Sequence, residues 1–307
     1  MLMETLFSSV TFASTLRTST PLILAAVGGC YGNKAGIFNI ALESFILISA
    51  FFATWGSYAA ANAYVGLLCG ILAGFVCAII FSIFVFHLGS DGMVVSIAMN
   101  LGAWGFTTLM MSAIFDARGN FVDPRIISLP AFDIPGLGAI PFVSDVFNNH
   151  NILVYFSIVS IALMWIIMYK TPFGLRVRGV GINAAAAEAT GTNMLSLQWA
   201  ASLITGLFCG MAGAVLPLGG TSVFTENMSA GRGFLAVAAI LLAKGNPLVA
   251  GLTCVLFAYT DALTVGLENL GIPSQLVQTL PYVATILVLL AFNIKQFTGR
   301  RSSCIRY

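Results

Sequence analysis

Long apolar runs, separated by short polar segments, make up most of the chain. Several runs reach the ~20 residues that a helix needs to cross ~30 Å of hydrocarbon. The pattern predicts membrane-spanning helices over residues 37–58, 64–87, 91–115, 152–169, 195–218, 248–267 and 275–292, after a shorter first segment at 21–32. The sequence therefore predicts a bundle of helices with little chain outside it.

One apolar run is too short to cross a membrane upright. Residues 234–243 number only about ten and follow the glycine-rich stretch 219–233. This run either completes a broken helix that crosses or re-enters on the same side. Crossing gives about nine segments, within a range of eight to ten, with the N-terminus outside. Crossing also places most lysines and arginines in the cytoplasm, as the positive-inside rule favours, including Lys244 and the tail that holds Arg300, Arg301 and Arg306.

The chain is expected to form a single domain, residues 1–307, in which polar segments connect the helices. Residues 1–20 are expected to form an amphipathic lead-in on the outer face. The proline-rich, acidic stretch 116–151 is expected to form an outer loop. The basic stretch 170–193 is expected to lie in the cytoplasm, which gives a multi-pass protein of the plasma or inner membrane with a cytoplasmic C-terminus.

Composition agrees with this pattern and excludes most other classes. The chain is 59% hydrophobic and 8% charged, whereas soluble domains are about 25% charged. The fold class is therefore all-α and polytopic in the membrane. Two isolated histidines and unpaired cysteines assemble neither a catalytic group nor a metal site. No phosphate-binding P-loop is present, so any ATP hydrolysis must be done by another chain. We expect no cofactor in this chain and no nucleic-acid partner.

The cytoplasmic stretch 170–193 carries the signals of a short helix. Asn183 is a good N-cap for the alanines after it, and Gly191 stands where a helix C-terminus favours a left-handed residue. A small-residue helix facing the cytoplasm is suited to docking on a partner. The alternative is an ordinary connector at the membrane surface.

Few polar side chains lie within the apolar runs, and each is a candidate for lining a solute pathway. Charged Glu43 and Asp261 would each cost at least ~2.5 kcal/mol in lipid, so they should face the bundle interior or water. Asn39 lies four residues before Glu43, which would place both on one helix face. These residues and Asn100 either line a pathway or join helices by hydrogen bonds.

Two aromatic residues, Trp104 and Phe234, complete the pathway candidates. Either ring could stack on a base or a sugar, and packing between helices is the alternative.

Six spaced blocks resemble the permeases of ABC importers for sugars and nucleosides, in the same order and over nearly the whole chain. They are Gly36-Ile-Phe-Asn-Ile-Ala-Leu-Glu43, Thr171-Pro-Phe-Gly-Leu-Arg-Val-Arg-Gly-Val-Gly181, Gly206-Leu-Phe-Cys-Gly-Met-Ala-Gly213, Gly231-Arg-Gly-Phe234, Gly245-Asn-Pro247 and Pro281-Tyr-Val-Ala-Thr285. The block ending in Glu43 and the acidic outer loop are most similar to purine-nucleoside importer permeases. The resemblance implies nucleoside import, with a simple sugar such as ribose or galactose as the alternative and an ion-coupled carrier as a further one.

The same resemblance implies partners and a coupling site. An importer of this kind has a second permease subunit, here expected to be a related chain, two cytoplasmic ATPase subunits that bind ATP and Mg²⁺, and an outer lipoprotein that binds the solute. Stretch 170–193 would be the coupling helix, with contacts at Arg178, Gly181, Asn183, Ala187, Glu188 and Gly191. This chain departs from the family's usual Gly-Glu-Asn-Pro there, with Gly181-Ile-Asn-Ala184, so the family's acidic contact is absent.

Overall fold

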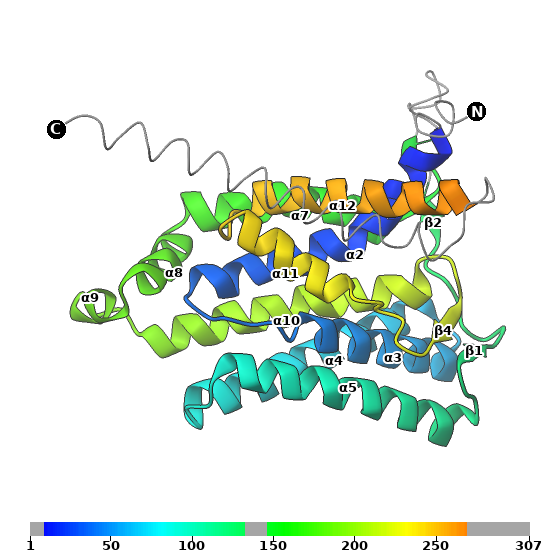
Figure 1. The fold of residues 1–307 in the computed structure, drawn as a ribbon, viewed down its shortest axis with the longest axis horizontal. Helices are drawn as coiled ribbons and strands as arrows, with labels where there is room; N and C mark the ends of the chain where they lie inside the picture. Colours follow the sequence, from blue (N-terminus) through cyan, green and yellow to red (C-terminus); the bar gives the residue numbers. More distant parts are fainter. Residues whose placement is uncertain (1–8, 133–145, 269–307) are drawn as a thin grey trace.

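The computed structural model describes residues 9–132 and 146–268, and Figure 1 shows them as a bundle of helices with short strands at one end. The helices are α2 (Ser9–Lys34), α3 (Leu42–Ala60), α4 (Ala63–Ser82), the π-helix η1 (Ile83–His87), α5 (Gly92–Phe115), α7 (Ile152–Lys170), α8 (Pro172–Ile182), α9 (Ala184–Ala189), α10 (Met194–Leu218), α11 (Arg232–Leu242) and α12 (Pro247–Glu268). The strands are β1 (Asn120–Val122), β2 (Ala131–Phe132), β3 (His150–Asn151) and β4 (Val223–Thr225).

Six helices in the described ranges are long and apolar enough to cross a membrane: α2, α4 with η1, α5, α7, α10 and α12. This confirms a mostly helical, multi-pass membrane fold. The 19 residues of α3 and the 11 residues of α11 add two further apolar helices. The predicted span 275–292, residues 1–8 of the predicted lead-in and residues 133–145 of the predicted outer loop lie outside the described residues.

Helix α2 runs through the middle of the bundle (Figure 1). It packs against α7, α10, α11 and α12, and the side chains from Leu22 to Val27 are each at most 2% exposed. The helix begins at Ser9, so residues 9–20 of the predicted lead-in are helical and continuous with the first span. Thr15, Ser19 and Thr20 are buried because their hydroxyls bond to carbonyls of the preceding turn, which lets a polar sequence pack in the core.

Glycines let α4 and α10 approach each other closely. A Cβ atom on Gly74 would lie 2.5 Å from the carbonyl oxygen of Gly206, and one on Gly210 would lie 2.8 Å from the Cα of Ile71. Neither position accepts a side chain without separating the helices. The glycines on both helices therefore serve helix packing.

Short antiparallel strands close one end of the bundle. Strand β1 pairs with β4, and β2 pairs with β3, so the segment after α5 is joined to the segment after α10 and to the start of α7. The Arg125 guanidinium lies 4.0 Å from the centre of the Tyr58 ring at the end of α3. These contacts define the sheet end of the molecule, opposite the end that carries α8 and α9 (Figure 1).

His150 joins α2 to the sheet end as a neutral imidazole. The Arg17 guanidinium donates a hydrogen bond to its Nδ1 at 3.3 Å, so Nε2 carries the proton and donates to the Val146 carbonyl at 2.8 Å. Burial lowers the pKa of His150, the Val146 hydrogen bond opposes that shift, and the Arg17 charge adds to it.

Candidate functional site

Two helices begin inside the bundle instead of at its ends. Helix α3 starts beside α10, where Gly213 approaches the Ile46 carbonyl in the second turn of α3, and it ends at the sheet end. Helix α11 also starts inside, but it runs toward the α8 end, where Gly245 meets Asn33 and Lys34 at the end of α2 (Figure 1). The N-termini of α3 and the shorter α11 therefore meet in the interior.

The carboxylate of Glu43 joins these two N-termini. It lies in the first turn of α3 and is only 7% exposed. Its Oε1 accepts a hydrogen bond from the Gly231 N–H at 2.9 Å, and its Oε2 accepts one from the Gly233 N–H at 2.7 Å. Both donors belong to the start of α11, where the helix dipole favours a negative charge. A buried carboxylate is stabilised here by two backbone donors.

The backbone around Glu43 is shaped by two glycines of the α11 N-terminus. Gly231 is the N-cap and has a φ of +81°, a left-handed conformation that favours glycine. A Cβ on Gly233 would lie 2.4 Å from the backbone nitrogen of Glu43, so no other residue allows α11 to approach α3 this closely. The backbone of the block Gly231-Arg-Gly-Phe234 therefore binds the Glu43 carboxylate.

Side chains of α5 satisfy the backbone at the break, which is the irregular segment 37–41 between α2 and α3. The Asn100 side chain accepts a hydrogen bond from the Ser44 N–H at 3.0 Å and donates one to the Ile40 carbonyl at 3.2 Å. The Ser96 hydroxyl accepts from the Ile40 N–H at 3.1 Å. Irregular backbone at membrane depth persists only where such partners satisfy it.

Asn39 belongs to this break and not to a helix. Residues 37–40 belong to neither a helix nor a strand; they follow Gly36, whose φ is +79°, and α3 begins only at Leu42. The Asn39 side chain accepts a hydrogen bond from the Ala41 N–H at 2.7 Å, a turn that competes with helix formation. The prediction that Asn39 and Glu43 share one helix face is therefore wrong.

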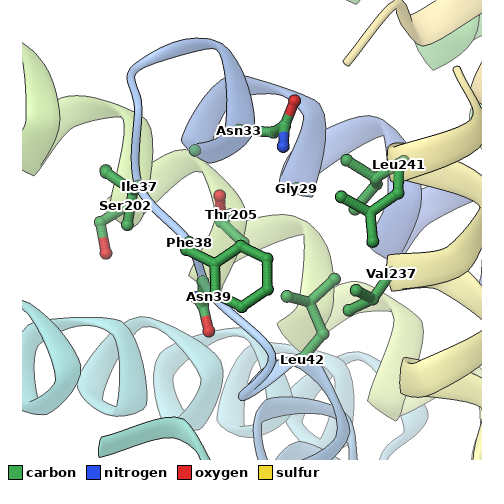
Figure 2. Close-up of a pocket in the computed structure, with 12 residues that line it drawn as sticks. Gly29, Asn33, Ile37, Phe38, Asn39, Leu42, Ser202, Thr205, Val237 and Leu241 are labelled. Atoms are coloured by element: carbon green, nitrogen blue, oxygen red, sulfur yellow. The ribbon is translucent and has the colours of Figure 1, made fainter. Parts of the chain in front are cut away.

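A small cavity lies beside the break, between α2, α10 and α11. Figure 2 shows the segment with Phe38 and Asn39 passing in front of α10, with Asn33 of α2 on one side and α11 on the other. The cavity measures about 20 Å³, which is room for one water molecule.

The remaining pathway candidates lie at two different places. Trp104 on α5 and Phe234 on α11 are 55% and 49% exposed, so neither ring is part of the described core. Asp261 lies on α12, whose neighbouring residues contact the first part of α2, with the Phe12 and Tyr259 rings 6.0 Å apart. The structure brings Asn39, Glu43 and Asn100 together and leaves Asp261 on another side of α2.

At the opposite end from the strands, α8 and α9 form a projection with a hollow between them and α10. The Asn183 side chain caps α9 by accepting a hydrogen bond from the Ala186 N–H at 3.1 Å, and Gly191 after the helix has a φ of +79°. Both local predictions are confirmed. Ala187 and Gly191 line the hollow, while Glu188 is exposed.

Helix α8, which sequence reasoning missed, supports this projection. Thr171 caps it and Pro172 occupies its first turn, a pair of signals that could have identified the helix. Gly181 lies against α2, since a Cβ there would stand 2.0 Å from the Lys34 carbonyl oxygen. The Arg178 guanidinium lies 4.7 Å from the centre of the Tyr169 ring. These contacts join the projection to the ends of α2 and α7.

Comparison with known proteins agrees with this architecture. Residues 11–289 match the family described as branched-chain amino acid transport system / permease component. The chain belongs to this family. A solved ABC transporter of metal-chelate type in an inward-facing conformation has a TM-score of 0.52 at 14% identity, covering 92% of this chain and 85% of that one, which shows a shared fold.

Several curated relatives match this chain over most of the length of both proteins. The nucleoside ABC transporter permease NupC of Lactococcus lactis is 31% identical, with 91% of each chain covered. The guanosine ABC transporter permease NupQ of Bacillus subtilis is 32% identical, with 92% of each covered. A second nucleoside permease of the same Lactococcus strain, NupB, is 23% identical over 96% of this chain and 83% of NupB. The family thus includes pairs of permeases within one organism.

Proposed function

We propose that this chain is one of two permease subunits of an ABC importer that carries a nucleoside, with a purine nucleoside as the expected cargo. The observation that carries the proposal is the identity above 30%, over more than nine-tenths of the chain, to permeases named for nucleosides and for guanosine. The sparse charge within the spans is compatible with a neutral polar solute. A simple sugar is less supported by these relatives.

The assembly that we propose has a different partner on each side. A related second permease follows from the pairing of NupB with NupC in one strain. Two ATPase subunits, which bind ATP and Mg²⁺, would dock on α8 and α9, with Asn183, Ala187 and Glu188 among the contacts. A lipoprotein that binds the solute would approach the sheet end from outside.

The proposed orientation places the N-terminus outside and the C-terminus in the cytoplasm. Six long helices, α3 and α11 with the irregular segments before them, and the predicted span 275–292 together make nine crossings. The charge distribution supports this count, because Lys34, Lys170 and Lys244 then lie on the cytoplasmic side.

The proposal is tested by uptake into proteoliposomes that carry the full assembly. Radiolabelled guanosine and adenosine should accumulate in an ATP-dependent way, with competition by unlabelled nucleosides and none by excess ribose. Uptake of ribose or galactose without nucleoside uptake would overturn the cargo. Uptake driven by an ion gradient, without the ATPase subunits, would overturn the importer class.

A further inference from the structure

Two lysines from distant parts of the chain come together at the α8 end. Lys34 is the last residue of α2, and Lys244 lies in the turn between α11 and α12. A Cβ on Gly245 would lie 3.1 Å from the Cγ and 3.2 Å from the Cε of Lys34, so the Lys34 side chain lies against the turn that holds Lys244. Asn33 contacts the same turn, with its Oδ1 2.7 Å from that Cβ position. The turn therefore carries two ammonium groups and a neutral amide, which we call the lysine pair and its amide.

Neither lysine of the pair has a carboxylate partner among the described residues. Within 9–132 and 146–268, the ion pair that forms is Arg125 with Asp123, at the sheet end. The sequence holds no acidic residue after Glu268. Asp91, at the same end of the bundle as the lysine pair, is engaged in capping the first turn of α5. Because neighbouring cations repel each other, this arrangement favours an anion from outside the chain.

The lysine pair lies at the depth of the phospholipid headgroups. Lys34 ends α2 and Lys244 shortly precedes α12, and both helices are long and apolar enough to cross a membrane. Helix α9 lies farther out, beyond the ends of both (Figure 1). A lysine at the end of a membrane-spanning helix keeps its ammonium group in the headgroup layer. The anion available at that level is a lipid phosphate.

An aliphatic face leads away from the lysine pair along α12. Leu248, Leu252 and Leu256 follow one another at a spacing of four residues, and all three are exposed. The opposite face of the helix is buried, and its Cys254 thiol donates to the Leu22 carbonyl of α2 at 3.5 Å. A phosphate held at the start of α12 would place lipid acyl chains beside these leucines. The surface therefore fits a ligand with an anionic head and an apolar tail.

Helix α4 has the apolar half of such a surface without the charges. Its exposed aliphatic stripe runs from Val65 to Ile80. Toward the α8 end, α4 continues into η1 and His87, whose ring lies 5.6 Å from that of Trp199 near the start of α10. Residues 83–99 contain no lysine or arginine. A lipid-facing helix end does not by itself bring lysines together, so the charge at α12 is a distinct feature.

We propose that Lys34 and Lys244 bind the phosphate of an anionic phospholipid whose acyl chains lie along the leucine face of α12. Each lysine near an anionic lipid surface strengthens binding by about fivefold. A zwitterionic lipid has the same phosphate, but its own ammonium group offsets that charge. The lipid would join the end of the central helix α2 to the α11–α12 turn. This inference is independent of the solute that the chain carries.

Quenching of tryptophan fluorescence by brominated lipids reports which lipid lies beside a chosen helix. The full chain is reconstituted into liposomes of phosphatidylcholine and phosphatidylglycerol, with its four native tryptophans changed to phenylalanine. With Leu252→Trp on α12, brominated phosphatidylglycerol should quench with an apparent affinity about fivefold or more above that of brominated phosphatidylcholine. With the matched control Leu72→Trp, on the exposed face of α4, the two lipids should quench equally. Equal quenching at both positions would overturn the proposal.

Lysine variants test whether the pair causes the preference. In the Leu252→Trp chain, Lys34→Gln and Lys244→Gln should each lower the preference for phosphatidylglycerol about fivefold, whereas Lys34→Arg should retain it because the charge remains. Lys170→Gln, at the exposed end of α7, should leave it within about twofold, since charges on another helix are screened. All variants should melt like the parent in phosphatidylcholine alone. A preference that survives the double change to glutamine would show that the lysines do not bind the lipid.

Two further outcomes identify other anions. If inorganic phosphate abolishes the preference while sodium chloride at equal ionic strength does not, the lysine pair binds free phosphate and the lipid assignment is wrong. If the glutamine variants keep the lipid preference but lose co-purifying ATPase subunits, the pair contacts an acidic protein surface instead. Loss of the lipid preference with ATPase recovery unchanged supports the lipid site.

Discussion

At the scale of single residues, Glu43 shows what a sequence can and cannot reveal. Its position in an apolar run indicates that it needs a partner, because an unpaired charge in lipid is costly. The partner is not visible in the sequence, since it consists of two backbone N–H groups at positions 231 and 233, about 190 residues away. Backbone donors have no residue identity to recognise. Asn100 was ambiguous for the same reason, because it caps α3 through backbone atoms of Ile40 and Ser44.

Replacing Glu43 should therefore destabilise the subunit in a graded way. Glu43→Ala leaves two buried N–H groups without acceptors, at a cost of about 1–3 kcal/mol for each. Glu43→Gln should cost less, because an amide oxygen still accepts one hydrogen bond. Thermal melting in detergent should rank wild type above Gln and Gln above Ala, and the exposed control Glu188→Gln should melt like wild type.

A different result would reassign the carboxylate. If Glu43→Gln melts at the wild-type temperature while nucleoside uptake falls severalfold, Glu43 acts on the solute and not on α11. Prior measurement of membrane insertion and expression excludes loss of the subunit as the cause.

At the scale of elements, the starts of three helices with a side-chain cap were predicted from the sequence. Asp91, Asn151 and Asn193 each accept hydrogen bonds from the first turn of α5, α7 and α10, and the predicted starts of these helices agree within one residue. Helix α3 has no side-chain cap of its own at Ala41. The predicted start of α3 was wrong because residues 37–40 are mostly apolar but not helical. Side chains of α5 hydrogen-bond to the Ile40 backbone in this segment.

The capped helix α9 gives a test of coupling. Ala187→Arg adds a long cation to the hollow between α8, α9 and α10, outside the membrane, so folding and insertion should be unaffected. ATPase subunits should co-purify less with this variant, and uptake should fall at equal expression. Val122→Arg, an equally drastic change at a 68% exposed position of the sheet end, should retain the ATPase. Normal ATPase recovery and uptake in Ala187→Arg would exclude α9 as the contact.

At the scale of the whole molecule, the broken segment after α10 was the open question. In the structure the chain leaves β4 at the sheet end and reaches Gly245 beside Lys34 at the other end, so the glycine-rich loop and α11 pass the length of the bundle together. Sequence length alone cannot distinguish this from re-entry, because α11 has only 11 residues in either case.

The orientation that follows is measurable in intact cells. Among cysteines introduced one at a time into a background without native cysteines, Val122→Cys at the sheet end should react with an impermeant thiol reagent. Glu188→Cys on α9 and Ser303→Cys in the tail should be protected until the membrane is opened. Labelling of Ser303→Cys in sealed cells would contradict a cytoplasmic C-terminus, and labelling of Glu188→Cys would invert the molecule.

The central position of α2 has a consequence for biosynthesis. Among the six apolar helices described, it has the lowest mean hydropathy, 1.2. Its partners are made late: the Thr205 hydroxyl bonds the Gly28 carbonyl, and the Thr18 hydroxyl bonds the Ala258 carbonyl. At ~5–20 residues per second, translation takes roughly 10–40 s to reach those partners. During that interval the insertion machinery has to shelter a weakly hydrophobic helix, so the first described helix reaches its final position only when α10 and α12 emerge.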